Sequence, residues 1–184
     1  AHPAVTRAIA EQAGRLVHTS NLYGIALQEQ LADRLSEVSG MDRVFFSNSG
    51  AEANVAAIKI ARLYGHSRGI DNPAIIVTDR SFHGRTMATL SATGNRKVQA
   101  GFEPLVPGFV RVPYNDLDAI RTVAENSDEV VAILVEPVQG EGGINIPNAG
   151  YLEGIRSLCD DNQWLMMLDE IQSGMGRTGR WFAY

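Results

Sequence analysis

The sequence of 184 residues contains a single cysteine, Cys159, and only two lysines, Lys59 and Lys97, among its 16 basic residues. One cysteine excludes a disulfide framework within the chain and favours a reducing compartment such as the cytoplasm. Every other basic residue is an arginine. Any chemistry that needs a lysine amine therefore has just two candidates in this chain.

Long apolar runs and basic blocks are also missing. The longest apolar run, Val130–Val135, is far shorter than the roughly 20 residues that span a bilayer. Charged residues at positions 7, 11 and 15 interrupt any apolar core of an export signal, so we expect neither export nor a membrane partner. The net charge of −5 argues against nucleic-acid binding. Composition and length predict a single globular domain.

Short apolar segments alternate with stretches of helical periodicity. We predict strands at 44–47, 74–77, 109–112, 130–135 and 164–168, and helices over 3–18, 27–38, 53–64, 117–124 and 151–159. Continuous apolar strands that alternate with helices are typical of an α/β layer fold around a mostly parallel sheet. Ligands of such folds bind beyond the carboxyl ends of the strands, so the residues after each strand are the candidates for a site.

Two helix starts stand out in this pattern. The small residues Ser49, Gly50 and Ala51 precede the helix over 53–64, and free backbone N–H groups at a helix start attract phosphate. An ordinary N-cap at Ser49 or Asn48 explains the same pattern.

Within this helix the apolar spacing from Ala53 to Tyr64 predicts the buried face. Asn115 is the expected N-cap of the helix over 117–124.

Residues after the next strands carry charge and an aromatic ring. Phe82 and Arg85 follow the strand at 74–77 and could stack on a planar ring and bind a carboxylate, or could be a buried ring and a structural ion pair. Glu136 and Glu141 follow the strand at 130–135 in a glycine-rich loop. They could act as an acid–base pair, bind cations, or simply be solvated.

Asp169 is the most unusual residue of the set. A carboxylate at the end of an apolar strand costs free energy unless a cation pairs with it. The stretch 165–170 imitates the magnesium-binding strand of P-loop NTPases, but no Gly-Lys-Ser/Thr loop accompanies it. Residues 174–179 match G-x-G-x-x-G, which keeps a dinucleotide-binding module open as an alternative. The four histidines show no metal-ligand spacing, so we expect no metal.

One ligand would use all of these strand ends. Pyridoxal phosphate has an anionic phosphate, a planar ring and a ring nitrogen that acts as an electron sink only when it is protonated. An aspartate beside that nitrogen is the expected tuning device, and Asp169 is the candidate.

Four blocks of the sequence support this hypothesis: SNSGAEAN, FHGRTMATLSATGN, EPVQGEGGI and LDEIQSGMGRTGRWFAY. They resemble the class III pyridoxal-phosphate aminotransferases. The resemblance implies a three-layer α/β sandwich with a mostly parallel sheet, part of the large domain of the fold-type I transferases. It also implies a homodimer that transfers an amino group from a small-molecule donor to 2-oxoglutarate. The FHGRT and PLVPGF segments favour N2-acetylornithine as the donor, and thus arginine biosynthesis. Ornithine, succinylornithine and 4-aminobutyrate remain alternatives.

The resemblance also implies roles for single residues. Backbone N–H groups of Gly50 and Ala51, beside Ser49, would hold the cofactor phosphate. Its ring would be contacted by three side chains: Phe82 by stacking, Asp169 at the pyridine nitrogen and Gln172 at the phenolic oxygen. Arg85 would bind a substrate carboxylate, and Glu141 matches the family's gatekeeper acid.

One departure concerns the lysine that carries the cofactor. In the family the Schiff-base lysine lies beyond the Asp-Glu-x-Gln block, and this sequence ends before that stretch. We therefore expect residues 1–184 to be part of the large domain, without the family's N-terminal segment, lysine region and C-terminal small domain. Lys59 lies on the polar face of a predicted helix and Lys97 in a polar stretch where we expect a solvated ammonium. Neither segment offers the apolar pocket that lowers the pKa of a catalytic lysine, so we expect no transamination by the chain alone. A third interpretation is a non-catalytic chain that only folds or associates with a partner.

Overall fold

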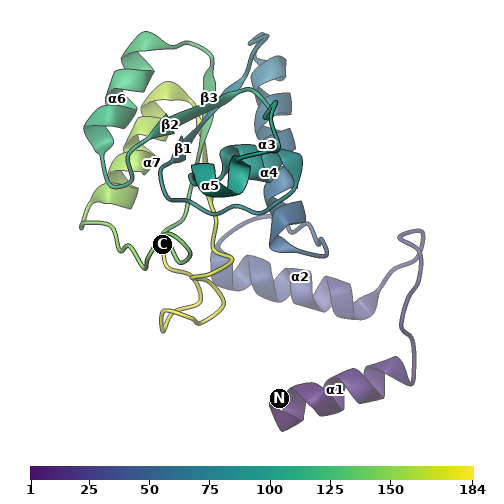
Figure 1. Ribbon diagram of the computed structural model, residues 1–184. Helices are drawn as coiled ribbons and strands as arrows, with labels where there is room; N and C mark the ends of the chain where they lie inside the picture. Colours follow the sequence, from purple (N-terminus) through teal and green to yellow (C-terminus); the bar gives the residue numbers. More distant parts are fainter. The chain divides into compact units, whose positions relative to one another are not determined.

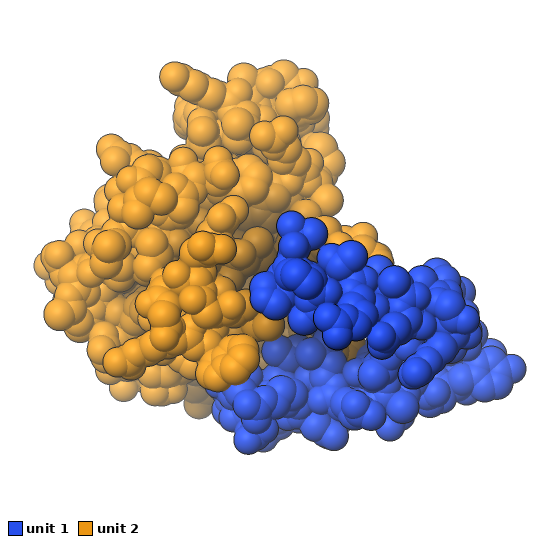
Figure 2. All heavy atoms as spheres, turned by 90° about the horizontal axis from the view of Figure 1, so that it is seen from below, with its two compact units in different colours: residues 1–45 blue, residues 46–184 orange.

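The computed structural model describes residues 1–184, which divide into two compact units, residues 1–45 and 46–184 (Figure 2). The length of the chain predicts one domain, whereas the structure has two compact units. The first unit holds the helices α1 (Pro3–Ala13) and α2 (Ala26–Ser39), and neither buries a single residue. The separation therefore follows from the lack of an apolar core in this part of the chain. None of the helices in the chain is both long and apolar enough to cross a membrane.

The second unit is built on one parallel sheet. Its strands are β1 (Ala74–Thr78), β2 (Phe109–Val112), β3 (Val130–Val135) and β4 (Leu165–Leu168), in the spatial order β2-β1-β3-β4. Ile75 of β1 lies opposite Phe109 of β2 on one side and Ala132 of β3 on the other. The helices are α3 (Gly50–Ser67), α4 (Met87–Ala92), α5 (Arg96–Gln99), α6 (Leu117–Asn126) and α7 (Tyr151–Asn162).

Helices cover both faces of this sheet, as Figure 1 shows. On one face Ile133 packs in a core with Ile120 of α6 and Ile155 of α7. On the other face Leu134 packs in a core with Ile58 and Ala61 of α3. Alternate residues of a strand point to opposite faces, which is why β3 is apolar throughout and fully buried. The predicted three-layer α/β fold with a parallel sheet is confirmed.

Several predicted boundaries are wrong. Residues 44–47 form no strand, because no neighbouring strand takes their backbone N–H and C=O groups, and Phe45 is exposed. The first helix ends at Ala13 rather than at residue 18, with Gly14 as its C-cap. Helix α6 is capped by Asp116, whose side chain accepts from the N–H of Ala119, and not by Asn115 as predicted.

The buried face of α3 also differs from the prediction. Its buried residues are Asn54, Ile58, Ala61 and Gly65, whereas Ile60 and Leu63, which belong to the predicted face, are exposed. Gly65 fits there because an added Cβ would lie 2.7 Å from Pro73. The true stripe therefore begins with a polar residue, and the apolar pattern alone points to the wrong side of the helix.

The sequence patterns gave no sign of the short helices α4 and α5. The guanidinium of Arg111 on β2 holds the end of α4 by donating to the carbonyls of Ser91 and Thr93, each at 3.1 Å. Helix ends leave carbonyls without partners, and this side chain supplies donors from the sheet. These hydrogen bonds hold the segment at the end of α4 in place beside the loop that follows β1.

Candidate active site

The start of α3 is a built helix cap. Ser49 is the N-cap, and its hydroxyl accepts from the N–H of Glu52 at 3.2 Å. The carboxylate of Glu52 in turn accepts from the backbone N–H of Asn48, the residue before the N-cap, at 2.7 Å. The capping prediction is confirmed. The cap leaves the N–H groups of Gly50 and Ala51 at the helix start for an external acceptor.

Glycines show how closely three segments meet at this helix start. Gly84, in the loop after β1, has φ +124°, and a Cβ there would lie 2.8 Å from the Cβ of Ala51. A Cβ on Gly50 would lie 2.7 Å from the side chain of Ile171, just after β4. Larger residues at either position would push the segments apart. The start of α3, the loop after β1 and the end of β4 therefore form one cluster.

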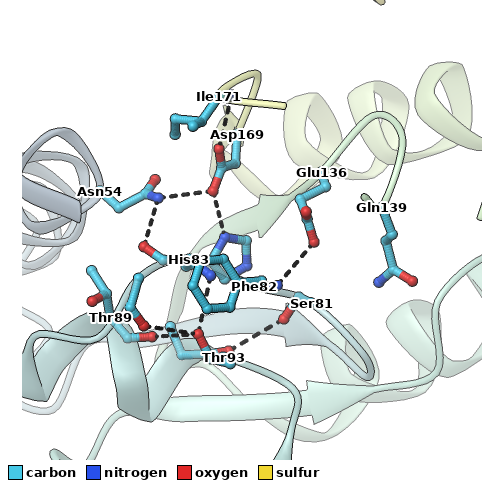
Figure 3. Close-up of polar contacts among 12 residues, drawn as sticks. Asn54, Ser81, Phe82, His83, Thr89, Thr93, Glu136, Gln139, Asp169 and Ile171 are labelled. Carbon is cyan, nitrogen blue, oxygen red and sulfur yellow. Dashed lines mark hydrogen bonds and ion pairs between the residues drawn. The ribbon is translucent and has the colours of Figure 1, made fainter. Parts of the chain in front are cut away.

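Asp169 lies at the centre of this cluster and is 5% exposed. Its Oδ2 accepts from Nδ1 of His83 at 2.7 Å and from Nδ2 of Asn54 at 2.8 Å (Figure 3). Its Oδ1 accepts from the backbone N–H of Ile171 at 3.1 Å. A cation was expected beside this carboxylate, but no lysine or arginine pairs with it. Its partners are instead an imidazole and an amide.

Glu136 occupies the end of the neighbouring strand β3 and is 2% exposed. Its Oε2 accepts from the backbone N–H of Phe82 at 3.1 Å, whereas its Oε1 is buried without a partner. Burial raises the pKa of Glu136 to about 7, and the nearby carboxylates of Asp169 and Glu141 act in the same direction. The backbone N–H groups of Phe82 and Gly140 lower the pKa and oppose this rise only in part.

Of the alternatives left open for Glu136 and Glu141, a solvated position suits Glu141 only, because Glu136 is buried. Glu141 is exposed and lines a cavity of about 410 Å³ together with Phe82 and Arg85. Glu136 is buried against the loop after β1, whereas Glu141 is exposed, so the two acids lie in different environments. Three further cationic side chains line the same cavity: Arg80, Arg96 and Lys97.

The two lysines differ in their positions. Lys59 is exposed on α3. Lys97 is also exposed, in agreement with the prediction of a solvated lysine, and it lines the cavity that contains Arg85. The reason is the unpredicted helix α5, which follows a segment bonded to the loop after β1 through the N–H of Gly94 and the carbonyl of Ser81, at 2.9 Å.

Gln172 and the glycine-rich stretch follow β4. Gln172 is exposed, and its side chain packs against Gly140, where a Cβ would lie 3.2 Å from its Cγ. Residues 174–179 form turns with no helix behind them. A dinucleotide fingerprint needs a helix whose start receives the pyrophosphate, so the G-x-G-x-x-G match lacks its structural context.

Sequence reasoning missed Asn54 and His83 as members of the cluster. Asn54 was missed because it lies on a helix whose polar residues were assigned to the solvent face. His83 was considered only as a metal ligand. Its position directly after Phe82, in a loop at a strand end, was the available signal for a role beside Asp169.

Comparisons with known proteins agree with this arrangement. The model of the aminotransferase class III family matches residues 1–184. The acetylornithine aminotransferase of Nitrosomonas europaea is 65% identical over 183 residues, which are 100% of this chain and 47% of that protein. The chain thus spans about half the length of the curated relatives it matches.

Solved structures give the same result. The N-acetylornithine aminotransferase of Stenotrophomonas maltophilia K279a matches with a TM-score of 0.82 and 40% identity over 99% of this chain and 44% of that one. An ornithine aminotransferase of Toxoplasma gondii, described with partial occupancy of PLP at its active site, matches with a TM-score of 0.93 and 37% identity over the same shares. From its matched residues and its fold, this chain belongs to the class III aminotransferase family.

Proposed function

We propose that this chain provides cofactor- and substrate-binding residues of an enzyme that transfers the δ-amino group of N2-acetyl-L-ornithine to 2-oxoglutarate. The products are N-acetyl-L-glutamate 5-semialdehyde and L-glutamate, a step of arginine biosynthesis. The observation that carries the proposal is the buried carboxylate of Asp169, which has no lysine or arginine partner. A protonated ring nitrogen of pyridoxal phosphate would supply the missing positive charge.

The residues around Asp169 suit that cofactor. When bound, pyridoxal phosphate supplies an electron sink and a carrier for the amino group. Asp169 would hold a proton at its ring nitrogen, and the ring of Phe82 would stack on it. The N–H groups of Gly50 and Ala51 and the hydroxyl of Ser49 would bind its phosphate, where the helix dipole favours an anion. Gln172 would reach its phenolic oxygen.

The cavity beside Phe82 suits anionic substrates. Arg85 would bind a substrate carboxylate in a bidentate manner, and the cavity's other cations favour dicarboxylates such as 2-oxoglutarate. Glu141 is the single acid there and would act as a gate toward Arg85. The names of the similar proteins favour acetylornithine as the amino donor. Ornithine, succinylornithine and 4-aminobutyrate are the alternatives.

We also propose that the enzyme is a homodimer in the cytoplasm. Helices α1 and α2 bury none of their residues, and the exposed apolar side chains Val5, Ile9, Leu27 and Leu31 suit coverage by a second copy. The single cysteine supports the reducing compartment.

A chimera tests the function directly. These 184 residues replace the matched part of the Nitrosomonas europaea protein, and the purified chimera is assayed with acetylornithine, ornithine, succinylornithine and 4-aminobutyrate. We expect acetylornithine to have the highest kcat/KM. Faster turnover of another donor would correct the substrate, and a folded chimera that turns over none of them would overturn the proposal. In this chimera, Arg85→Ala should mainly raise the KM of the substrate.

A further inference from the structure

Two buried side chains bond to one oxygen of a buried carboxylate. Asn54, His83 and Asp169 are 5%, 2% and 5% exposed, and both polar neighbours bond to Oδ2 of Asp169. A carboxylate only accepts hydrogen bonds, so Nδ1 of His83 carries the hydrogen that joins it to Asp169. Nε2 of His83 is buried with no hydrogen-bond partner. A hydrogen on that atom would be an unsatisfied buried donor, which favours the neutral ring with hydrogen on Nδ1 alone.

Asn54 connects three parts of the cluster through one nitrogen. Its Nδ2 donates to Asp169 at 2.8 Å and to the backbone carbonyl of His83 at 2.9 Å. It lies on α3, about one turn beyond Gly50 and Ala51. The same side chain therefore joins the helix proposed to hold the phosphate, the loop that carries Phe82, and the carboxylate after β4 (Figure 3).

The energetics indicate what these contacts achieve. A buried carboxylate stays ionised only where hydrogen-bond donors replace its lost water. Asp169 has three such donors, and a donor to a charged group contributes more than one to a neutral group. Without Asn54, Oδ2 would keep only the imidazole, and the carboxylate would be held by two donors instead of three.

We propose that Asn54 is a positioning residue that, together with His83 in its Nδ1–H form, keeps the carboxylate of Asp169 ionised and aimed at the cofactor's ring nitrogen. The inference rests on the proposed cofactor. It concerns residues whose roles no sequence motif assigned, and it makes Asn54 act through Asp169 rather than on the cofactor itself.

The test compares two ligands that differ at one ring atom. Wild-type chain, Asn54→Ala and the exposed control Asn126→Ala are titrated with pyridoxal phosphate and with its analogue in which carbon replaces the ring nitrogen. We expect Asn54→Ala to weaken binding of pyridoxal phosphate by about ten- to a hundredfold, the loss of one charge-assisted bond. The analogue should bind wild type and Asn54→Ala alike, and Asn126→Ala should change neither affinity. Asn54→Ser, which keeps one donor, should lie between.

The outcomes separate the two proposals. If wild type does not prefer pyridoxal phosphate to the analogue, the proposed cofactor site fails. If wild type prefers it but Asn54→Ala weakens both ligands equally or neither, Asn54 has only a structural role or none, and the inference fails.

A second measurement uses the wild-type chain alone, without a ligand and without a variant. In the ¹⁵N spectrum of the unliganded wild-type chain, we expect a protonated Nδ1 and an unprotonated Nε2 for His83 at neutral pH. A protonated Nε2 together with an unprotonated Nδ1 would overturn the inference.

Discussion

Two neighbouring strands of the sheet end in buried carboxyl groups that differ in their partners. Asp169 after β4 receives three hydrogen bonds, two of them from side chains. Glu136 after β3 receives the backbone N–H of Phe82 on one oxygen, and its other oxygen is buried without a partner. Both are almost fully buried, so exposure does not separate them.

The difference shows that the supply of donors decides which buried acid can carry charge. Three donors stabilise the carboxylate of Asp169, whereas desolvation raises the pKa of Glu136 to about 7. Two adjacent residues connect the pair, because Phe82 donates to Glu136 and His83 donates to Asp169. The loop after β1 thus joins one acid suited to hold a cationic ring nitrogen and one suited to hold a proton.

Removal of the well-partnered acid should have the largest effect. Asp169→Ala leaves the donors of Asn54, His83 and Ile171 facing an apolar group, so we expect the free energy of unfolding to fall by about 3 kcal/mol or more. Urea denaturation measures this loss, with the exposed Asp161→Ala as control. A loss below about 1 kcal/mol would contradict the account. In the chimera, Asp169→Ala should lower turnover by several orders of magnitude.

The connecting loop can be displaced without changing either acid. Gly84→Ala introduces a Cβ 2.8 Å from that of Ala51 at a φ of +124°, and we expect a loss of about 2–3 kcal/mol. Gly69→Ala is the matched control, because its φ is +77° and nothing lies within 4 Å of the added Cβ. That variant should lose only about 1 kcal/mol. Equal losses would mean that the close approach of the loop to α3 does not matter.

Glu136 should make the free energy of unfolding depend on pH. Its pKa rises from the ordinary 4.5 to about 7 on folding, so between these values the folded state alone keeps the proton. The folded state therefore loses stability as the pH rises through this window, by about 2–3 kcal/mol. Glu136→Gln removes this contribution, so the difference between variant and wild type should grow in the variant's favour from pH 5 to pH 8. A constant difference would contradict the raised pKa.

The smallest effect should come from the residue that positions His83. Thr93→Val removes the hydroxyl that accepts from the backbone N–H of His83 at 3.0 Å and leaves that N–H buried. We expect a loss of about 1–2 kcal/mol. The exposed Thr122→Val on α6 should lose less than about 0.5 kcal/mol. The slope of stability with pH that Glu136 causes should persist in Thr93→Val, and its disappearance would show that the two acids are not independent.

The parts of the fold that could be predicted are those in which local pattern and tertiary structure agree. Val130–Val135 is apolar throughout and mostly β-branched, so its burial on both faces was evident. Asp169 was recognisable because a charge that ends an apolar strand demands a partner. The identity of that partner was not, since His83 lies 86 residues earlier in the sequence.

The failures have a common cause. Asn54 occupies the buried stripe of α3 because its amide has acceptors in the cluster, and periodicity treats a polar residue as solvent-facing. Residues 44–47 have the composition of a strand but no partner. Both errors concern contacts between distant segments, which local sequence patterns do not contain.

The central claim is that these strand ends bind pyridoxal phosphate. The most direct measurement is a titration of the ¹⁵N-labelled chain with pyridoxal phosphate and, separately, with NAD, followed through its assigned amide and imidazole signals. The account predicts saturable shifts at Gly50, Ala51 and the ring of His83 with pyridoxal phosphate, and none at these positions with NAD. Shifts confined to residues 174–179, or tighter binding of NAD, would contradict it.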